Sequence, residues 1–402
     1  MTFDMKTILS HPSFTAATDA LRADHDRFVE EIVTLTEIPA PPFKEERRAA
    51  AYAERFCALG LEDVTTDAIG NVTGLRRGRG NGSLIVVSAH LDTVFPEGTD
   101  VTVRREGTKL FAPGVGDDTR GLAALLAFVR ALDAAGIRTE HDVLFMGDVG
   151  EEGKGDLRGV RHFFTEGAYR DKVAAFFTID GIETPDLVTG AVGSNRYRVT
   201  FRGPGGHSLG AFGTVNPAYA MGEMLVGLSK MEVPADPRTS YCASVFGGGT
   251  SINAIPEEVW VEVDLRSTSP AELGRIDAEM HRLIATAVEN ENARGDTANG
   301  PIRAEAARIG ARPAGGTAHD QRIVTASMEA IRAFGFTPVL SASSTDANIP
   351  MSLGIPAVKF GSGGAGGRAH TLEEWIDVEP ELSLRGLNAA LAAILGTAGM
   401  EV

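Results

Sequence analysis

The chain has 402 residues, a hydrophobic fraction of 43%, and a formal net charge of −16 from 38 basic and 54 acidic residues. This length indicates two or three domains with an ample core, and the ordinary hydrophobic fraction excludes wholesale disorder. The acidic balance argues against binding to nucleic acid, which requires clustered Lys and Arg.

Cysteine content and apolar runs narrow the class of protein further. The only two cysteines, Cys57 and Cys242, exclude a disulfide framework, and we expect both to be small buried hydrophobes. Residues 1–37 lack a basic start followed by an apolar run, and no apolar window approaches 18 residues. These features predict a cytoplasmic protein without a membrane partner.

In the first half of the chain, helical patterns alternate with continuous apolar runs. Helices are predicted over 26–35, 45–59 and 121–135, and buried strands over 84–89, 143–146 and 173–179. Strands that are apolar on both faces and alternate with helices are typical of a mixed, largely parallel sheet between helices. This α/β arrangement is the predicted catalytic domain.

The pattern changes after residue 193. Strands with one wet face are predicted near 197–201, 240–246 and 259–265, a short strand near 302–307, and helices over 217–230 and 270–292. The order β-α-β-β-α-β is ferredoxin-like. We therefore predict an inserted α+β domain over 194–310. The α/β pattern then resumes with helices over 322–334 and 380–396 and a strand over 357–360, so that 1–193 and 311–402 form the first domain.

Two acidic motifs follow apolar strands. His90 and Asp92 come just after the strand 84–89, and they suit a metal ligand and a carboxylate that orients its imidazole. A hydrogen-bonded surface pair is the plainer interpretation. Glu151 and Glu152 follow the strand 143–146. One could bind a metal while the other acts as a general base, although a solvated loop would look the same.

Three further residues complete a candidate metal set. Asp117 opens an apolar helix after a glycine-rich turn, where it could bridge two ions or simply cap the helix. Asp180 follows the strand 173–179, and His370 follows a run of glycines. Each of these has an ordinary structural explanation when taken alone. Together the residues His90, Asp117, Glu152, Asp180 and His370 suit two zinc ions that share one carboxylate, with Co²⁺ or Mn²⁺ as substitutes.

These motifs resemble the co-catalytic zinc metallopeptidase family of peptidase T, glutamate carboxypeptidase, aminoacylase and succinyl-diaminopimelate desuccinylase. The resemblance covers nearly the whole chain, and peptidase T-like members look most similar. It implies that His90, Asp117 and Asp180 hold one zinc ion, and that Asp117, Glu152 and His370 hold the other. It also implies that Glu151 is the catalytic base and that Asp92 supports His90. Thr119 departs from the family's frequent Lys at that position, which is not a ligand.

The inserted domain carries the other matching residues. In this family it is a lid that often dimerises, which implies a homodimer here. His207 resembles the family's lid histidine, which reaches a partner subunit's active site and stabilises the oxyanion. Asn253 matches a substrate-contacting Asn, and Arg266 matches an Arg that binds a substrate carboxylate. The plain alternatives are a turn histidine and a surface arginine at a strand end.

The predicted function is metal-dependent hydrolysis of amide bonds in small peptides, by a di-/tripeptidase or an aminopeptidase. Two alternatives stay open at this point. A carboxypeptidase or N-acyl-amino-acid amidohydrolase would use the same residues on a different substrate. A non-catalytic binding protein on the same fold should have lost a ligand or the base, whereas the five ligands and Glu151 are all present.

Overall fold

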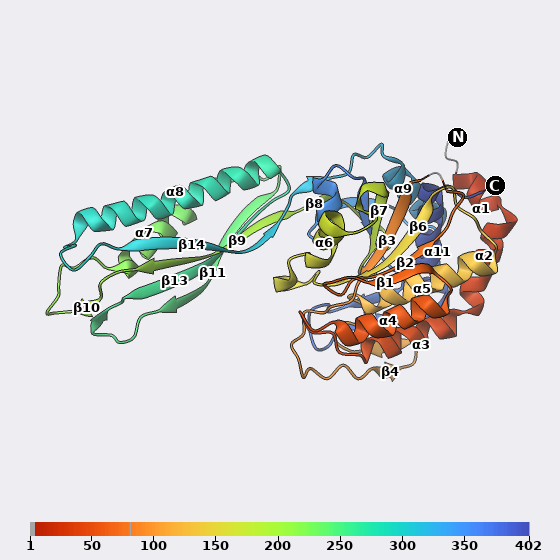
Figure 1. The fold of residues 1–402 in the computed structure, drawn as a ribbon, viewed down its shortest axis with the longest axis horizontal. Coiled ribbons are helices and arrows are strands. Elements are labelled where there is room, and N and C mark those ends of the chain that lie inside the picture. Colours follow the sequence, from red (N-terminus) through yellow and green to blue (C-terminus); the bar gives the residue numbers. More distant parts are fainter. Residues whose placement is uncertain (1–4, 81, 402) are drawn as a thin grey trace. The chain divides into compact units, whose positions relative to one another are not determined.

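The computed structural model describes residues 5–80 and 82–401, and the chain divides into two compact units. Unit 1 comprises Met1–Ala191 and Gly316–Val402, and unit 2 is the segment Val192–Gly315 between them. Figure 1 labels many of the helices and strands of each unit. Within the described ranges, none of the helices has the length and apolar character needed to cross a membrane.

Unit 1 is built on a nine-stranded mixed sheet. The strands run in the order β1-β2-β6-β3-β7-β17-β8-β15, and β16 also pairs with β8. Their bounds are β1 Glu62–Thr66, β2 Val72–Arg76, β3 Leu84–His90, β6 Asp142–Asp148, β7 Val173–Ile179, β8 Asp186–Ala191, β15 Gly315–Gly316, β16 Val339–Ser343 and β17 Ala357–Phe360. The central strands β6, β3, β7 and β17 are parallel, which confirms the predicted α/β class. Their carboxyl ends therefore meet at one edge of the sheet.

Helices cover both faces of this sheet (Figure 1). Their bounds are α1 Met5–Ser10, α2 Pro12–Ala23, α3 His25–Thr36, α4 Glu46–Ala58, α5 Thr119–Ala134, α6 Arg158–Glu166, α9 Arg322–Ala333, α10 Asn348–Ser352 and α11 Pro380–Ala398. Alternate residues of β3 enter two cores: Ile85 and Val87 pack with α2–α5, α9 and α11, whereas Leu84 and Val86 pack with α6 and α10. Burial on both faces explains the continuous apolar runs of the central strands.

A second, smaller sheet of unit 1 lies outside the predicted elements. Its order is β18-β19-β5-β4, with bounds β4 Arg104–Glu106, β5 Lys109–Phe111, β18 Ala365–Gly367 and β19 Trp375–Asp377. Strands of three residues are too short to produce a periodic pattern, so the sequence gives no signal for them. This sheet joins the segment before Asp117 to the segment around His370.

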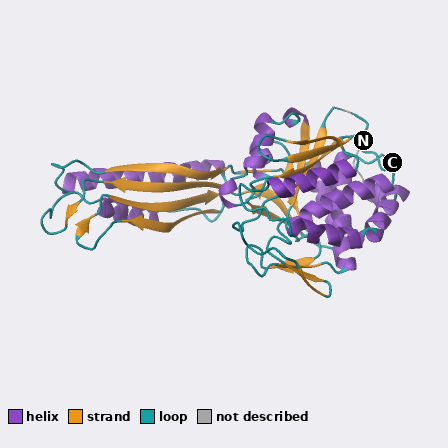
Figure 2. Cartoon of the chain, turned by 60° about the horizontal axis from the view of Figure 1, so that its bottom comes forward, coloured by secondary structure: helices purple, strands orange, loops and turns teal. Residues whose placement is uncertain are grey.

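Unit 2 has the β-α-β-β-α-β order, with two helices against a four-stranded antiparallel sheet (Figure 2). Its bounds are β9 Gly193–Arg202, α7 Pro217–Ser229, β11 Thr239–Gly248, β13 Glu258–Ser267, α8 Pro270–Arg294 and β14 Arg303–Arg312, with a short ribbon of β10 Gly206–His207 and β12 Ala254–Ile255. The sheet order β11-β13-β9-β14 is that of a ferredoxin-like fold. Alternate residues of β9 and β13 form the core of unit 2. The role of unit 2 as a lid stays a prediction.

The expectation of buried cysteines is wrong, since Cys57 and Cys242 are both exposed, and they form no disulfide. Cys57 follows the buried Phe56 on α4, so it lies about 100° further around the helix and points outward. Cys242 alternates with Tyr241 and Ala243, which pack against the core of unit 2, and therefore lies on the opposite face of β11.

Candidate metal centre and active site

The candidate site lies where the parallel strands of unit 1 end. His90 is the last residue of β3, Glu151 and Glu152 follow β6, and Asp180 directly follows β7. Asp117 comes from the turn before α5. Ligand sites of open α/β sheets form at this edge because loops from neighbouring strands converge there.

Asp117 lies between two imidazole rings. Its Oδ1 is 2.9 Å from Nε2 of His90, and its Oδ2 is 3.0 Å from Nε2 of His370. The same nitrogen of His370 is 2.8 Å from Oε1 of Glu152. Ligand atoms of His90, Asp117 and Glu152 all lie within 4.8 Å of one another. Each oxygen of one carboxylate therefore faces a different imidazole, an arrangement that suits a carboxylate shared between two ions.

Asp180 approaches this cluster without joining its hydrogen bonds. Its backbone N–H donates to the carbonyl of Phe360 at 3.1 Å, which fixes the start of the loop against β17. Burial and the negative charge of Asp117 raise the pKa of Asp180, so the two carboxylates are close in space. The structure describes no hydrogen bond from the Asp180 carboxylate to the other four candidate ligands.

The electrostatics of the cluster reflect many acids packed around two imidazoles. Burial opposes a charged imidazolium at His90, but the hydrogen bond with Asp117 and the nearby carboxylates outweigh it and raise its pKa well above the ordinary value. Hydrogen bonds with Asp117 and Glu152 raise the pKa of His370 to about 10. Burial disfavours the charged form of Asp117, yet its two imidazole partners lower its pKa. The site thus attracts positive charge strongly.

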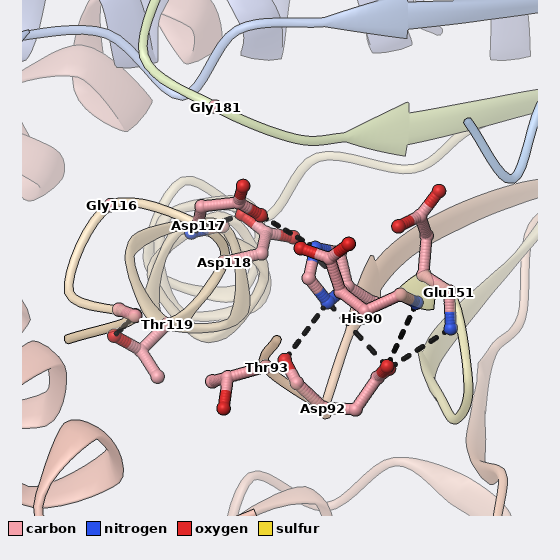
Figure 3. Close-up of polar contacts among 12 residues, drawn as sticks. His90, Asp92, Thr93, Gly116, Asp117, Asp118, Thr119, Glu151 and Gly181 are labelled. Atoms are coloured by element: carbon pink, nitrogen blue, oxygen red, sulfur yellow. Dashed lines mark hydrogen bonds and ion pairs between the residues drawn. The ribbon is translucent and has the colours of Figure 1, made fainter. Parts of the chain in front are cut away.

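Asp92 is completely buried and connects two loops of the site (Figure 3). Its carboxylate accepts the backbone N–H of Glu151 at 3.0 Å and that of Glu152 at 2.9 Å. Nδ1 of His90 is 3.1 Å from the backbone carbonyl of Asp92, and 3.7 Å from its carboxylate. The nearer partner of the imidazole is therefore this carbonyl, and the carboxylate mainly orients the loop of Glu151 and Glu152.

Asp118 has a structural role that sequence patterns only partly indicate. Its Oδ1 accepts the N–H of Gly121 at 3.2 Å, which is the helix cap expected for an acid at that position. Its Oδ2 accepts the backbone N–H of His90 at 3.2 Å. The residue thus fixes the end of β3 against the start of α5, a long-range contact that no local motif reveals.

The three remaining candidate residues belong to unit 2. His207 lies on β10 and Asn253 directly precedes β12, and the N–H of Ser208 donates to the carbonyl of Asn253 at 2.9 Å. Arg266 lies near the far end of β13, where its Nε donates to Asp264 at 2.7 Å. Unit 2 therefore brings His207 and Asn253 together, and it places Arg266 at the opposite end of the strand that follows them.

The hydrogen bonds of His207 determine its tautomer. Its Nδ1 accepts backbone N–H groups from Leu209 at 3.3 Å and from Gly210 at 3.2 Å. A neutral ring that accepts at Nδ1 carries its hydrogen on Nε2. The exposed side chain can therefore present an N–H donor to solvent or to a ligand.

Comparison with known proteins shows which family shares these features. The model of peptidase family M20/M25/M40 matches residues 86–395. A succinyl-diaminopimelate desuccinylase of Corynebacterium glutamicum is 26% identical over an alignment of 358 residues, and the match covers 86% of this chain and 90% of the relative. The crystal structure of aminopeptidase PepT from Bacillus cereus superposes with a TM-score of 0.75 at 23% identity, covering 92% of this chain and 98% of PepT. YXEP of Bacillus subtilis, described as a dinuclear metal binding peptidase, superposes with a TM-score of 0.69 at 18% identity, covering 94% and 99%.

Proposed function

Because the chain belongs to peptidase family M20/M25/M40, which identifies it as a hydrolase, we propose that it is a dinuclear zinc enzyme that cleaves amide bonds in small peptides. The observation that carries this proposal is the position of Asp117 between His90 and His370, with contacts of 2.9 and 3.0 Å to its two oxygens. Two imidazoles on one carboxylate, that of His90 buried and that of His370 exposed, match the requirements of paired divalent ions.

The donor set fits two ions of the zinc type. His90, Asp117 and Asp180 would hold one ion, and Asp117, Glu152 and His370 would hold the other. Mixed imidazole and carboxylate ligands suit Zn²⁺, and Co²⁺ or Mn²⁺ are reasonable substitutes. When bound, such ions polarise a carbonyl group and lower the pKa of water.

The side chains of this protein supply the remaining steps. Glu151 and Glu152 are both buried, each 6% exposed, but we give them different roles. Glu151 takes a proton from the attacking water and passes it to the leaving amine nitrogen. Asp92 holds the backbone of Glu151 in place. As the family resemblance implies, His207 of the partner subunit donates from Nε2 to the oxyanion of the tetrahedral intermediate, and Asn253 of the partner subunit contacts the substrate beside it. Arg266 binds a substrate carboxylate.

The substrate class has two candidates. The fold shared with aminopeptidase PepT supports a peptide substrate. The 26% identity with a succinyl-diaminopimelate desuccinylase supports the second candidate, hydrolysis of an N-acyl amino acid. Arg266 does not separate them, because peptides and acyl-amino acids both end in a carboxylate.

A substrate panel tests this choice directly. The zinc-loaded protein is incubated with tripeptides, dipeptides and N-acetyl or N-succinyl amino acids, and amine release is measured. We expect cleavage of peptides that is lost in a chelator and restored by Zn²⁺, Co²⁺ or Mn²⁺. Cleavage of N-acyl amino acids alone would favour the second candidate, and a lack of metal dependence would contradict the mechanism.

We further propose that the protein forms a homodimer through unit 2. Strand β11 is the edge of its sheet, and Val245 and Phe246 on it are 45% and 53% exposed. On helix α7, Tyr219 and Val226 are also exposed. An open strand edge beside apolar side chains suits pairing with the same edge of a second copy. Sedimentation of the wild type and of Phe246→Asp tests this, with dimer and monomer as the expected results.

A further inference from the structure

Glu374 is a buried acid that none of the motifs includes. It follows His370 in the same short loop, and its N–H donates to the carbonyl of Thr371 at 3.2 Å. The residue is only 2% exposed. An acid enclosed to this degree requires several hydrogen-bond donors, since burial disfavours its charged form.

The donors are three backbone N–H groups of the turn that carries Asp117. Oε2 of Glu374 accepts the N–H of Gly114 at 2.8 Å. Oε1 accepts the N–H of Gly116 at 2.8 Å and that of Asp117 itself at 2.9 Å. The backbone of Glu374 contributes too, because its carbonyl accepts the N–H of Ala112 at 3.1 Å. One residue therefore holds the segment from 112 to 117 along its whole length.

The turn is shaped to fit this carboxylate closely. A Cβ atom on Gly116 would lie 3.2 Å from Oε1 of Glu374 and 2.9 Å from Cγ2 of Ile376. Gly114 has φ of +77°, a conformation that favours glycine. The glycines before Asp117 thus permit three amides to converge on one buried acid.

This arrangement links two candidate ligands that come from distant parts of the chain. Glu374 shares a short loop with His370, and its side chain binds the backbone of Asp117. The imidazole of His370 in turn lies 3.0 Å from Oδ2 of Asp117. Any shift of the turn relative to Glu374 would change the spacing between these two ligands.

From these contacts we propose that Glu374 is a positioning residue that sets the spacing between Asp117 and His370 and thereby the affinity of the site for its ions. The inference rests on the proposed function, because it assumes that both residues are ligands. Glu374 itself touches neither ion nor substrate in this assignment. Residues that orient metal ligands typically change metal affinity or activity by about 10–100-fold when they are replaced.

The test compares Glu374→Gln with the matched control Glu373→Gln. Gln has nearly the volume of Glu, but its NH₂ group cannot accept an amide hydrogen, so at least one of the three contacts is lost. Glu373 is an exposed neighbour that forms an ion pair with the surface residue Arg368. Zinc affinity is measured by competition with a chromophoric chelator, and site geometry by the visible spectrum of the Co²⁺-loaded protein.

We expect Glu374→Gln to weaken zinc binding about 10–100-fold and to shift the Co²⁺ spectrum, and Glu373→Gln to match the wild type. At saturating metal, kcat should fall while KM changes little. Unchanged zinc affinity in a Glu374→Gln protein with native circular dichroism would overturn the inference. A Glu374→Gln protein that differs from the wild type only in a lower melting temperature of the apoprotein would overturn it too.

If Glu374→Gln fails to fold, Glu374→Asp serves as the second variant, since it keeps the charge but is too short to reach all three amides. The same affinity loss supports the inference, and wild-type affinity overturns it. A wild-type protein that binds no divalent ion would overturn the proposed function as well. Wild-type binding of two ions combined with unaffected variants would overturn this inference alone.

Discussion

The carboxylate of Asp92 accepts the backbone N–H of Glu151 at 3.0 Å, although the two residues belong to different loops. The bond joins the end of β3 to the loop after β6, and Asp92 receives the amide of Glu152 as well. A candidate base and a candidate ligand are therefore held by one acid that is fully buried. The orientation of Glu151 thus depends on a residue that does not touch the reacting atoms.

Replacement of Asp92 by Asn tests this dependence. Asn offers one carbonyl oxygen for two amides, and its NH₂ group faces an N–H donor. We expect kcat to fall by about 10–100-fold with a smaller change in KM. Steady-state kinetics at saturating metal measures this, and equal kcat in the variant and the wild type would show that the loop needs no such support.

Replacement of Glu151 by Gln removes the proposed base and preserves its volume. We expect both ions to be retained, because Glu151 is not among the proposed ligands, and kcat to fall by about 10²–10⁴-fold. Metal content by atomic emission and initial rates are the measurements. Unchanged turnover would remove Glu151 from the mechanism, whereas loss of metal would assign it to the ligand set.

Replacement of His207 by Ala tests the proposed oxyanion donor. The side chain is exposed and accepts hydrogen bonds from two local backbone amides, so the fold of unit 2 should persist. We expect kcat to fall by about 10²–10³-fold with KM little changed, as for other oxyanion donors. His207→Gln, which retains an N–H donor, should recover part of the rate. Equal rates in all three proteins would leave His207 as a turn residue.

His25 predicts a pH dependence of stability that is independent of the metal site. Burial, and then the charge of Arg120, lower its pKa. Its Nε2 finds no hydrogen-bond partner among the residues described. Between the lowered pKa and the ordinary value near 6.5, the unfolded chain binds the extra proton, so the free energy of unfolding falls as the pH falls.

We expect His25→Phe to reduce this fall in the free energy of unfolding at low pH, since Phe cannot bind a proton. At pH 8 the variant should be as stable as the wild type or more stable by about 1 kcal/mol, because an unsatisfied buried nitrogen is removed. Chemical denaturation between pH 5 and 8 measures both effects. An identical pH profile in the two proteins would contradict the assignment to His25.

The sequence predicts the parts of this structure that depend on local pattern. The seven residues of strand β3 are all buried, so its sequence is a recognisable, largely apolar run. Helix α5 is recognisable because an acid caps a long apolar run. The convergence of His90, Asp117, Glu152 and His370 follows from placing loops at one edge of a parallel sheet. Pattern and topology indicated that these four side chains would lie near one another, and they indicated the same for Asp180; the roles of all five as metal ligands stay a prediction.

Contacts between distant segments were not predictable in the same way. Glu374 and Gly114 are 260 positions apart, and a buried acid that collects backbone amides leaves no periodic signal. Strands such as β5 and β19 are too short to show alternation. The prediction that Cys242 is buried is wrong because it was based on residue type, whereas the exposure of this side chain depends on which face of the edge strand β11 it occupies.

The connection between the two units has a consequence for how such a chain can be altered. Strands β8 and β15 are neighbours in the main sheet, and the N–H of Thr317 donates to the carbonyl of Thr189 at 2.8 Å. The chain thus leaves unit 1 and re-enters it at adjacent points. Residues 192–315 can therefore be replaced by a different inserted domain, or by a tight turn. Such a replacement leaves unchanged the order of the unit 1 strands that position His90, Glu152 and Asp180.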